Sequence, residues 1–182
     1  MKYTLFLLLS TLTLNLSSQD SEMLNLVNTY RKLNGSTKLL WSDTLAKTSK
    51  GQVQVILKEN AVSHSNTMTE IATMGISLPP VKKEMDSFII FLKENLKVTY
   101  KEPKTEKEIL TLFKQYIIYQ FHSSDTHKAI LLGDYKYIGF HVELSKIIYN
   151  PNYILINGRV ITLNNMIGHY QGDYCAVINF RM

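Results

Sequence analysis

The stretch that decides the fold is Ser123-Ser124-Asp125-Thr126-His127-Lys128-Ala129-Ile130-Leu131-Leu132. Two serines and an aspartate stand directly before an apolar-periodic run, which predicts a helix with Ser124 as its N-cap. His127 then falls at the third helical position. There the positive end of the helix dipole disfavours protonation of the imidazole. A neutral imidazole offers a free ring nitrogen to a metal or a proton, so His127 is a candidate site residue.

The first residues are typical of an export signal. Lys2 precedes a short apolar run, Leu5 to Leu14, and polar residues follow up to Asp20. The run is too short to span a bilayer as a stable helix. We therefore expect a signal peptide over residues 1–18 and a single mature domain over 19–182, secreted into an extracellular or periplasmic compartment.

Composition limits the partners and the source of stability. Cys175 is the only cysteine, so no internal disulfide can form, and core burial must stabilise the domain. The formal net charge is +5, but the lysines between residues 82 and 107 alternate with glutamates. Nucleic-acid binding needs a concentrated basic face, so we expect no nucleic-acid partner. Weak contact with an anionic membrane surface stays open.

Apolar periodicity predicts helices first and strands last. The expected helices cover 21–33, 42–57, 85–92 with Glu94-Asn95-Leu96 closing it, 105–119, and the helix after Ser124. Strands are expected over 137–144, over 153–162 with Asn157-Gly158 as a hairpin turn, and over 174–180. This order predicts an α+β layered domain with an antiparallel sheet. Trp41 is expected to be a buried core anchor.

Several short motifs occur in a characteristic order along the chain. They are Asn28-x-x-Arg31, Leu39-x-Trp41-x-x-x-Leu45-Ala46, His64-Ser65, Glu94-Asn95-Leu96, Ser124-x-x-His127-Lys128-x-x-Leu131-Leu132 and Ile138-Gly139. In this order, over residues 21 to 182, the chain resembles the CAP superfamily of cysteine-rich secretory, antigen 5 and pathogenesis-related proteins, in its shorter bacterial-type branch.

The resemblance implies an α-β-α sandwich, with helices flanking a central antiparallel sheet, and a central cleft. By the same match, the residues of the cleft are His64, Glu94, Ser124 and His127, where Ser124 stands at the position of a second glutamate in larger members. His64 lies in a polar loop, where a histidine has no packing role to explain it.

Two classes of function follow. The first is a binding module whose cleft holds a lipid, a sterol or a peptide, an activity that the resemblance implies for some members. The second is a hydrolase that uses His64, Glu94 and His127, either metal-free or with a divalent metal such as zinc. Two imidazoles and a carboxylate would supply three zinc ligands and leave one position for water. His64 and His127 are therefore the candidate metal ligands, and whether the protein is an enzyme stays open.

Overall fold

The structure is a computed structural model that describes residues 18–65, 69–77, 82–150, 153–156, 159–162 and 169–182. Residues 1–17 of the predicted signal peptide lie outside the described part of the chain. The helices in the described part are α1 (Ser18–Leu33), α2 (Asp43–Glu59), α3 (Lys82–Phe91), the π-helix η1 (Leu92–Leu96), α4 (Glu106–His122) and α5 (Asp125–Leu132). The strands are β1 (Leu40–Trp41), β2 (Glu70–Ser77), β3 (Tyr137–Asn150), β4 (Tyr153–Ile156), β5 (Arg159–Thr162) and β6 (His169–Arg181).

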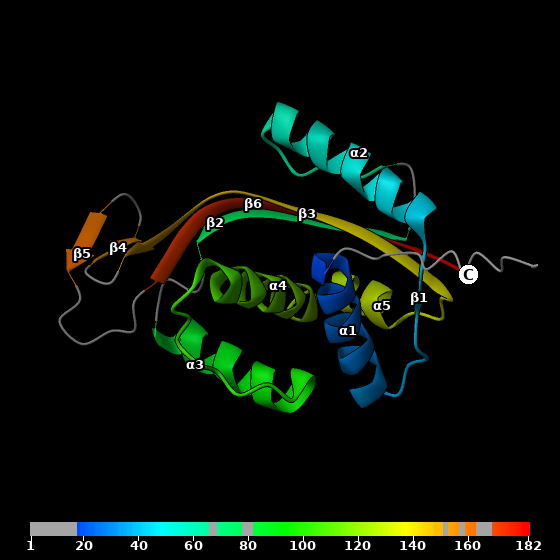
Figure 1. Cartoon of the computed structure of the whole chain (residues 1–182), viewed down its shortest axis with the longest axis horizontal. Coiled ribbons are helices and arrows are strands. Elements are labelled where there is room, and N and C mark those ends of the chain that lie inside the picture. Colours follow the sequence, from blue (N-terminus) through cyan, green and yellow to red (C-terminus); the bar gives the residue numbers. More distant parts are fainter. Residues whose placement is uncertain (1–17, 66–68, 78–81, 151–152, 157–158, 163–168) are drawn as a thin grey trace, which may run out of the picture.

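The elements form three layers around one sheet (Figure 1). Among the described strands, four make this sheet in the order β1-β3-β6-β2. Helix α2 covers one face, and α1, α3, α4 and α5 lie on the other. This arrangement confirms the predicted α-β-α sandwich. The sheet is mixed rather than wholly antiparallel, because the two-residue strand β1 runs parallel to β3.

Both faces of the sheet are buried. Along β6, Cys175 and Val177 pack with Val53 and Ile56 of α2, whereas Ala176 and Ile178 belong to the large core on the other side. Alternate residues of a strand point to opposite faces, so a strand covered on both sides reads as a continuous apolar run. The burial of Cys175 that the sequence predicts is confirmed.

The helix starts agree with the capping signals in the sequence. Ser42 precedes α2, and its hydroxyl accepts a hydrogen bond from the Leu45 N–H at 3.4 Å. Thr105 and Glu108 form a reciprocal capping box at the start of α4. Ser124 occupies the N-cap position of α5, but its side chain makes no capping hydrogen bond. All three helices therefore begin where their sequences predict.

The Ile138-Gly139 motif allows α2 to approach the sheet closely. A Cβ atom on Gly139 would lie 2.2 Å from the backbone nitrogen of Ala46. The Gly139 carbonyl accepts a hydrogen bond from the Ser49 hydroxyl at 3.0 Å, and the Asn179 amide donates to Ser49 at 3.0 Å. A glycine is needed here for space, because this buried hydrogen-bonded contact leaves no room for a side chain.

The Asn28-x-x-Arg31 motif fastens α1 to two other segments. Asn28 donates to the Leu39 carbonyl at 3.1 Å and accepts from the Leu39 N–H at 2.8 Å. Arg31 is fully buried and donates to the carbonyls of Thr37 at 2.8 Å and Leu131 at 2.7 Å. The guanidinium thus donates to a carbonyl at the end of α5, where the last carbonyl groups of a helix have no hydrogen-bond partner within the helix.

Three local expectations are corrected. Trp41 is half-buried, because it packs edge-to-face on Phe140 at 5.0 Å and donates its indole N–H to Asp43 at the surface. The sequence also predicted no strand where β2 lies. The third helix does not continue to residue 96 as an α-helix, since η1 adds a π-helical turn that ends at Lys97 in the left-handed conformation (φ 56°).

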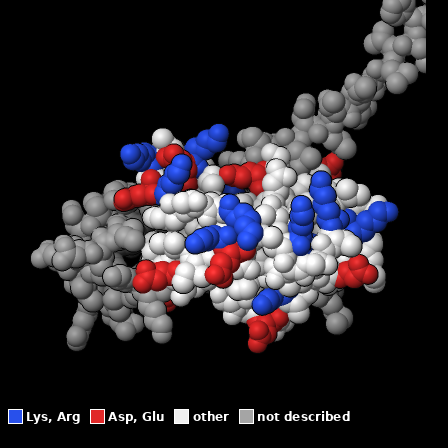
Figure 2. All heavy atoms as spheres, turned by 90° about the horizontal axis from the view of Figure 1, so that it is seen from below, with Lys and Arg blue, Asp and Glu red and all other residues white. Residues whose placement is uncertain are grey.

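The predicted pairing of residues 153–162 is confirmed, since β4 and β5 pair antiparallel from Tyr153 with Thr162 to Ile156 with Arg159. The predicted turn, Asn157-Gly158, lies outside the described residues. Within the described part of the chain, no helix is long and apolar enough to cross a membrane. On the face shown in Figure 2, basic and acidic side chains are interspersed over a largely uncharged surface.

Candidate functional site

A buried carboxylate lies beside His64. Glu70 opens β2, and its side chain is fully buried. One carboxylate oxygen accepts a hydrogen bond from the Ser65 N–H at 2.8 Å, and the other accepts the Ser65 hydroxyl. His64 Nδ1 lies 3.7 Å from the first of these oxygens. The separation is too long for a hydrogen bond, but it allows an ion pair whenever the imidazole is protonated.

The start of β2 is held by its pairing with β6. Glu70 stands opposite Asn179 in the register. The Thr69 hydroxyl donates to the Phe180 carbonyl at 2.8 Å, and the Phe180 N–H donates to the Thr69 carbonyl. These bonds fix the Glu70 carboxylate at the end of the sheet, so the sheet positions both Ser65 and the neighbouring His64.

His127 occupies the third position of α5, as the sequence predicts. Its ring packs edge-to-face on Phe121 at 5.5 Å. Burial holds the pKa of His127 below its usual range, and the nearby charge of His64 lowers it further. That influence requires the two rings to share one neighbourhood, since charge interactions across water fade with distance. This charge interaction is what relates His64 to His127; of the two histidines, His127 lines the cavity described below and His64 does not.

The other two predicted site residues lie differently. Glu94 is exposed on η1, and the carboxylate next to His64 belongs to Glu70. Ser124 is half-buried at the start of α5. Sequence reasoning missed Glu70, although one signal was present: it stands five residues after Ser65 and directly before the apolar Ile71-Ala72 pair.

A cavity of about 400 Å³ opens beside His127, between the second half of α4, α3 and β2. We use the name central cleft for this cavity; of the four cleft residues that the resemblance implies, His127 lines it, whereas His64, Glu94 and Ser124 do not. Its wall combines aromatic rings with hydroxyl, amide, imidazole and carboxylate groups, supplied by Thr73, Glu84, Tyr116, Tyr119, Gln120, Phe121, Ser123 and His127.

Gln120 is the centre of a polar network in this wall. Its carbonyl oxygen accepts hydrogen bonds from the Thr73 hydroxyl at 3.1 Å and the Tyr174 hydroxyl at 2.6 Å. Burial raises the pKa of Tyr116 to about 12 and also raises that of Tyr174. Both phenols remain protonated at neutral pH, and the Tyr174 hydroxyl acts as a donor to Gln120. A side-chain hydrogen bond from Gln120 to Tyr116 acts against the rise in the pKa of Tyr116, so Gln120 joins Thr73, Tyr116 and Tyr174 in one network.

A second histidine on α4 has a structural environment. His122 Nδ1 lies 2.8 Å from the Tyr30 hydroxyl, and the His122 ring packs on Phe91 at 4.9 Å. Burial and the charge of Lys128 hold the pKa of His122 below its usual range. This neutral imidazole joins α4 to α1 and α3, as expected for a histidine outside the matched motifs.

The metal hypothesis needs at least three converging ligands. In the part of the chain that the structure describes, no group of three or more His, Cys, Asp or Glu side chains is placed to hold a metal ion. His64 and His127 with the Glu70 carboxylate offer suitable donor types for zinc, but their present arrangement does not form such a set. Zinc binding through His64 and His127 stays a prediction.

Comparison with known protein families gives a match over most of the chain. The sequence model of the cysteine-rich secretory protein (CAP) family matches residues 24–154, well over half of the chain. This segment includes His64, Glu70, Glu94 and His127. No curated protein matches the sequence.

Proposed function

Because the chain belongs to the cysteine-rich secretory protein (CAP) family, we propose that it is an exported binding module that holds a small amphipathic ligand in its central cleft. The ligand is a lipid, a sterol or a peptide segment. We propose that residues 1–18 direct the export. Proteins of this family are typically secreted, which supports the proposed compartment.

The composition of the central cleft carries this proposal. Tyr116 and Tyr119 pack ring against ring at 5.9 Å in the wall, and Phe121 adds a third aromatic residue to the lining, which suits the apolar body of a ligand. Gln120 and His127 supply polar groups on the same wall. Small-molecule sites combine a mostly apolar concavity with a few polar groups that fix orientation, and about 400 Å³ falls within their usual size range.

A hydrolase is the second candidate, supported by His64, which lies 3.7 Å from the buried Glu70 carboxylate and whose charge lowers the pKa of His127. The hydrogen bonding of Ser65 weighs against a serine nucleophile there, because its hydroxyl donates to the Glu70 carboxylate. Since Glu94 is exposed on η1, the hydrolase hypothesis relies more on His64, Glu70 and His127 than on the predicted trio with Glu94.

Blocking the mouth of the cleft tests the binding proposal. Ser123 is exposed and lines the cleft, so Ser123→Trp should fill it without disturbing the core. Thr126 is also exposed but does not line the cleft, which makes Thr126→Trp a matched control. Native mass spectrometry of the exported proteins should show a retained ligand in the wild type and the control, with at least about tenfold less in Ser123→Trp.

Equal occupancy in the two tryptophan variants would refute the cleft as the binding site. The single variant His64→Ala separates the two candidate functions, because His64 does not line the central cleft. A binding module retains its ligand in this variant, whereas a hydrolase loses turnover of any substrate that the wild type cleaves.

A further inference from the structure

The lining of the central cleft contains a carboxylate and no basic chain to balance it. Of the described residues that line the cleft, Glu84 is the only aspartate or glutamate, and none is a lysine or an arginine. Burial favours the uncharged forms of Tyr116 and His127 at neutral pH, since it raises the pKa of the phenol and lowers the pKa of the imidazole. The lining therefore carries a negative charge, and a cleft lined by one sign of charge concentrates ligands of the opposite sign.

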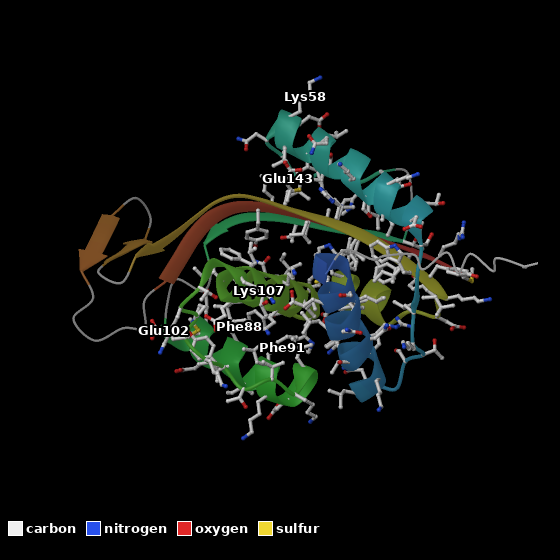
Figure 3. The ribbon with its side chains drawn as sticks, viewed as in Figure 1. Lys58, Phe88, Phe91, Glu102, Lys107 and Glu143 are labelled. Atoms are coloured by element: carbon white, nitrogen blue, oxygen red, sulfur yellow. The ribbon has the colours of Figure 1, made fainter. Side chains whose placement is uncertain are left out.

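Glu84 lies one helical turn before an aromatic cluster. Phe88 follows it by four residues on α3, so the two side chains share one face of the helix. Phe88 and Phe91 point from α3 toward α4 (Figure 3). There the Phe88 ring packs edge-to-face on Tyr116 at 5.5 Å and against Tyr119 at 5.4 Å. The face of α3 that carries Glu84 is therefore the face that packs on the aromatic wall of the cleft.

Tyr116 relates the carboxylate to the polar network of this wall. Burial is the main cause of the raised pKa of Tyr116, and the charge of Glu84 adds to the rise. The same tyrosine has a side-chain hydrogen bond with Gln120. The negative charge of Glu84 thus acts on the part of the cleft where the polar end of a ligand is expected.

Aromatic rings and a carboxylate together favour an organic cation. The face of a phenol ring is negative and attracts an ammonium group within about 6 Å of the ring centre. Tyr116 and Tyr119 supply two such rings to the lining, and Glu84 adds a full negative charge. A trimethylammonium group combines a positive charge with an apolar methyl surface, so it suits this wall. A carboxylate head group would be repelled by Glu84, and an uncharged hydroxyl group would gain nothing from its charge.

We propose that the ligand of the central cleft carries a quaternary ammonium group, which Glu84 and the rings of Tyr116 and Tyr119 favour over anionic and uncharged head groups. This inference rests on the binding function proposed above and names the chemical class of its ligand. A lipid with a cationic head group has this chemistry, whereas a sterol does not.

Probes with a common alkyl chain length test the head group: octyltrimethylammonium, octanoate and octanol. Amide chemical shifts of the isotope-labelled protein, followed through a titration, report both the affinity and the place of binding. Octyltrimethylammonium should bind in the cleft at least about fivefold more tightly than octanoate or octanol. Glu84→Gln keeps the shape of the side chain and removes its charge, so it should reduce this preference to less than about twofold.

Asp86→Asn is the matched control, because Asp86 is an exposed carboxylate on the same helix that does not line the cleft. This variant should keep the preference of the wild type. Glu84 also stands in the first turn of α3, where a carboxylate stabilises the positive end of the helix dipole. That structural role affects the stability of the helix but does not rank the probes by charge, so the ranking separates the two roles.

The proposal would be overturned by equal preference in Glu84→Gln and Asp86→Asn, or by a wild type that binds octanoate best. If all probes bound equally well and Ser123→Trp blocked them all, the charge preference would fail while the cleft would stand as the binding site. Shifts that persist in Ser123→Trp would place the ammonium probe outside the cleft and contradict both proposals. No shift with octyltrimethylammonium would overturn the ammonium site alone, because the ligand retained by the exported protein is measured separately.

Discussion

Replacement of Gly139 by alanine should destabilise the domain by about 2–5 kcal/mol. The new methyl carbon would stand 2.2 Å from Ala46 N and 2.5 Å from the Leu45 carbonyl carbon. Both atoms belong to the backbone at the start of α2, so the helix must move away from the sheet. Overpacking of this kind costs about 1–3 kcal/mol. The movement also strains two buried hydrogen bonds through Ser49, each worth about 1 kcal/mol.

The assay is urea denaturation followed by circular dichroism, with Gly51→Ala as the matched control. Gly51 lies in the interior of α2, and a Cβ atom there meets nothing within 4 Å. Alanine at this helical position should raise the free energy of unfolding by about 0.5–1 kcal/mol. The proposed close contact between α2 and β3 would be refuted if Gly139→Ala matched Gly51→Ala in stability.

Three further predictions concern single side chains. Glu70→Ala should lower the free energy of unfolding by about 1.5–3 kcal/mol, because it removes a buried acceptor of two Ser65 donors. Replacement of the exposed Glu94 by alanine should change the free energy of unfolding by less than about 0.5 kcal/mol. Similar losses of stability for the two variants in urea denaturation would contradict this prediction. The pKa of His127, measured by NMR titration, should rise in His64→Ala but stay below its usual value, because burial remains the larger cause. A folded-state pKa below the unfolded one means that the unfolded chain binds more protons. The contribution of His127 to stability is therefore complete above about pH 6.5 and is lost as the pH falls through the folded-state pKa. If the pKa of His127 were unchanged in His64→Ala, the charge of His64 would not act on His127. Burial raises the pKa of Cys175 to about 11, so a thiol reagent at pH 8 should label the protein only after unfolding. Rapid labelling of the native protein would contradict this, because it would show that Cys175 on β6 is accessible.

Local signals predicted the helices well and the strands less completely. Ser42, Thr105 and Ser124 mark helix starts because capping depends on residues adjacent in sequence. Strand β2 has no such signal. Its first residues, Glu70, Ile71 and Ala72, are all buried, so they do not show the polar and apolar alternation of a half-exposed strand.

The acidic residue beside His64 could not be assigned from sequence for a related reason. Glu94 precedes Asn95-Leu96 and fits a family motif, while Glu70 precedes a strand that sequence periodicity did not predict. Only the pairing of β2 with β6 brings the Glu70 carboxylate to Ser65 and His64. Similarly, the π-helical turn of η1, which contacts α1 and α3, has no sequence signal, because residues 92–96 show no pattern that separates them from an ordinary α-helix.

The most direct test of the proposed function is to locate the ligand that the exported protein retains. Isotope-filtered nuclear Overhauser spectra of the labelled protein with its copurified ligand would report which side chains the ligand touches. The binding proposal predicts contacts from the apolar part of the ligand to the rings of Tyr116, Tyr119 and Phe121, and from its polar end to the region of Gln120 and His127. Contacts confined to other surfaces, such as the outer face of α2, would contradict it.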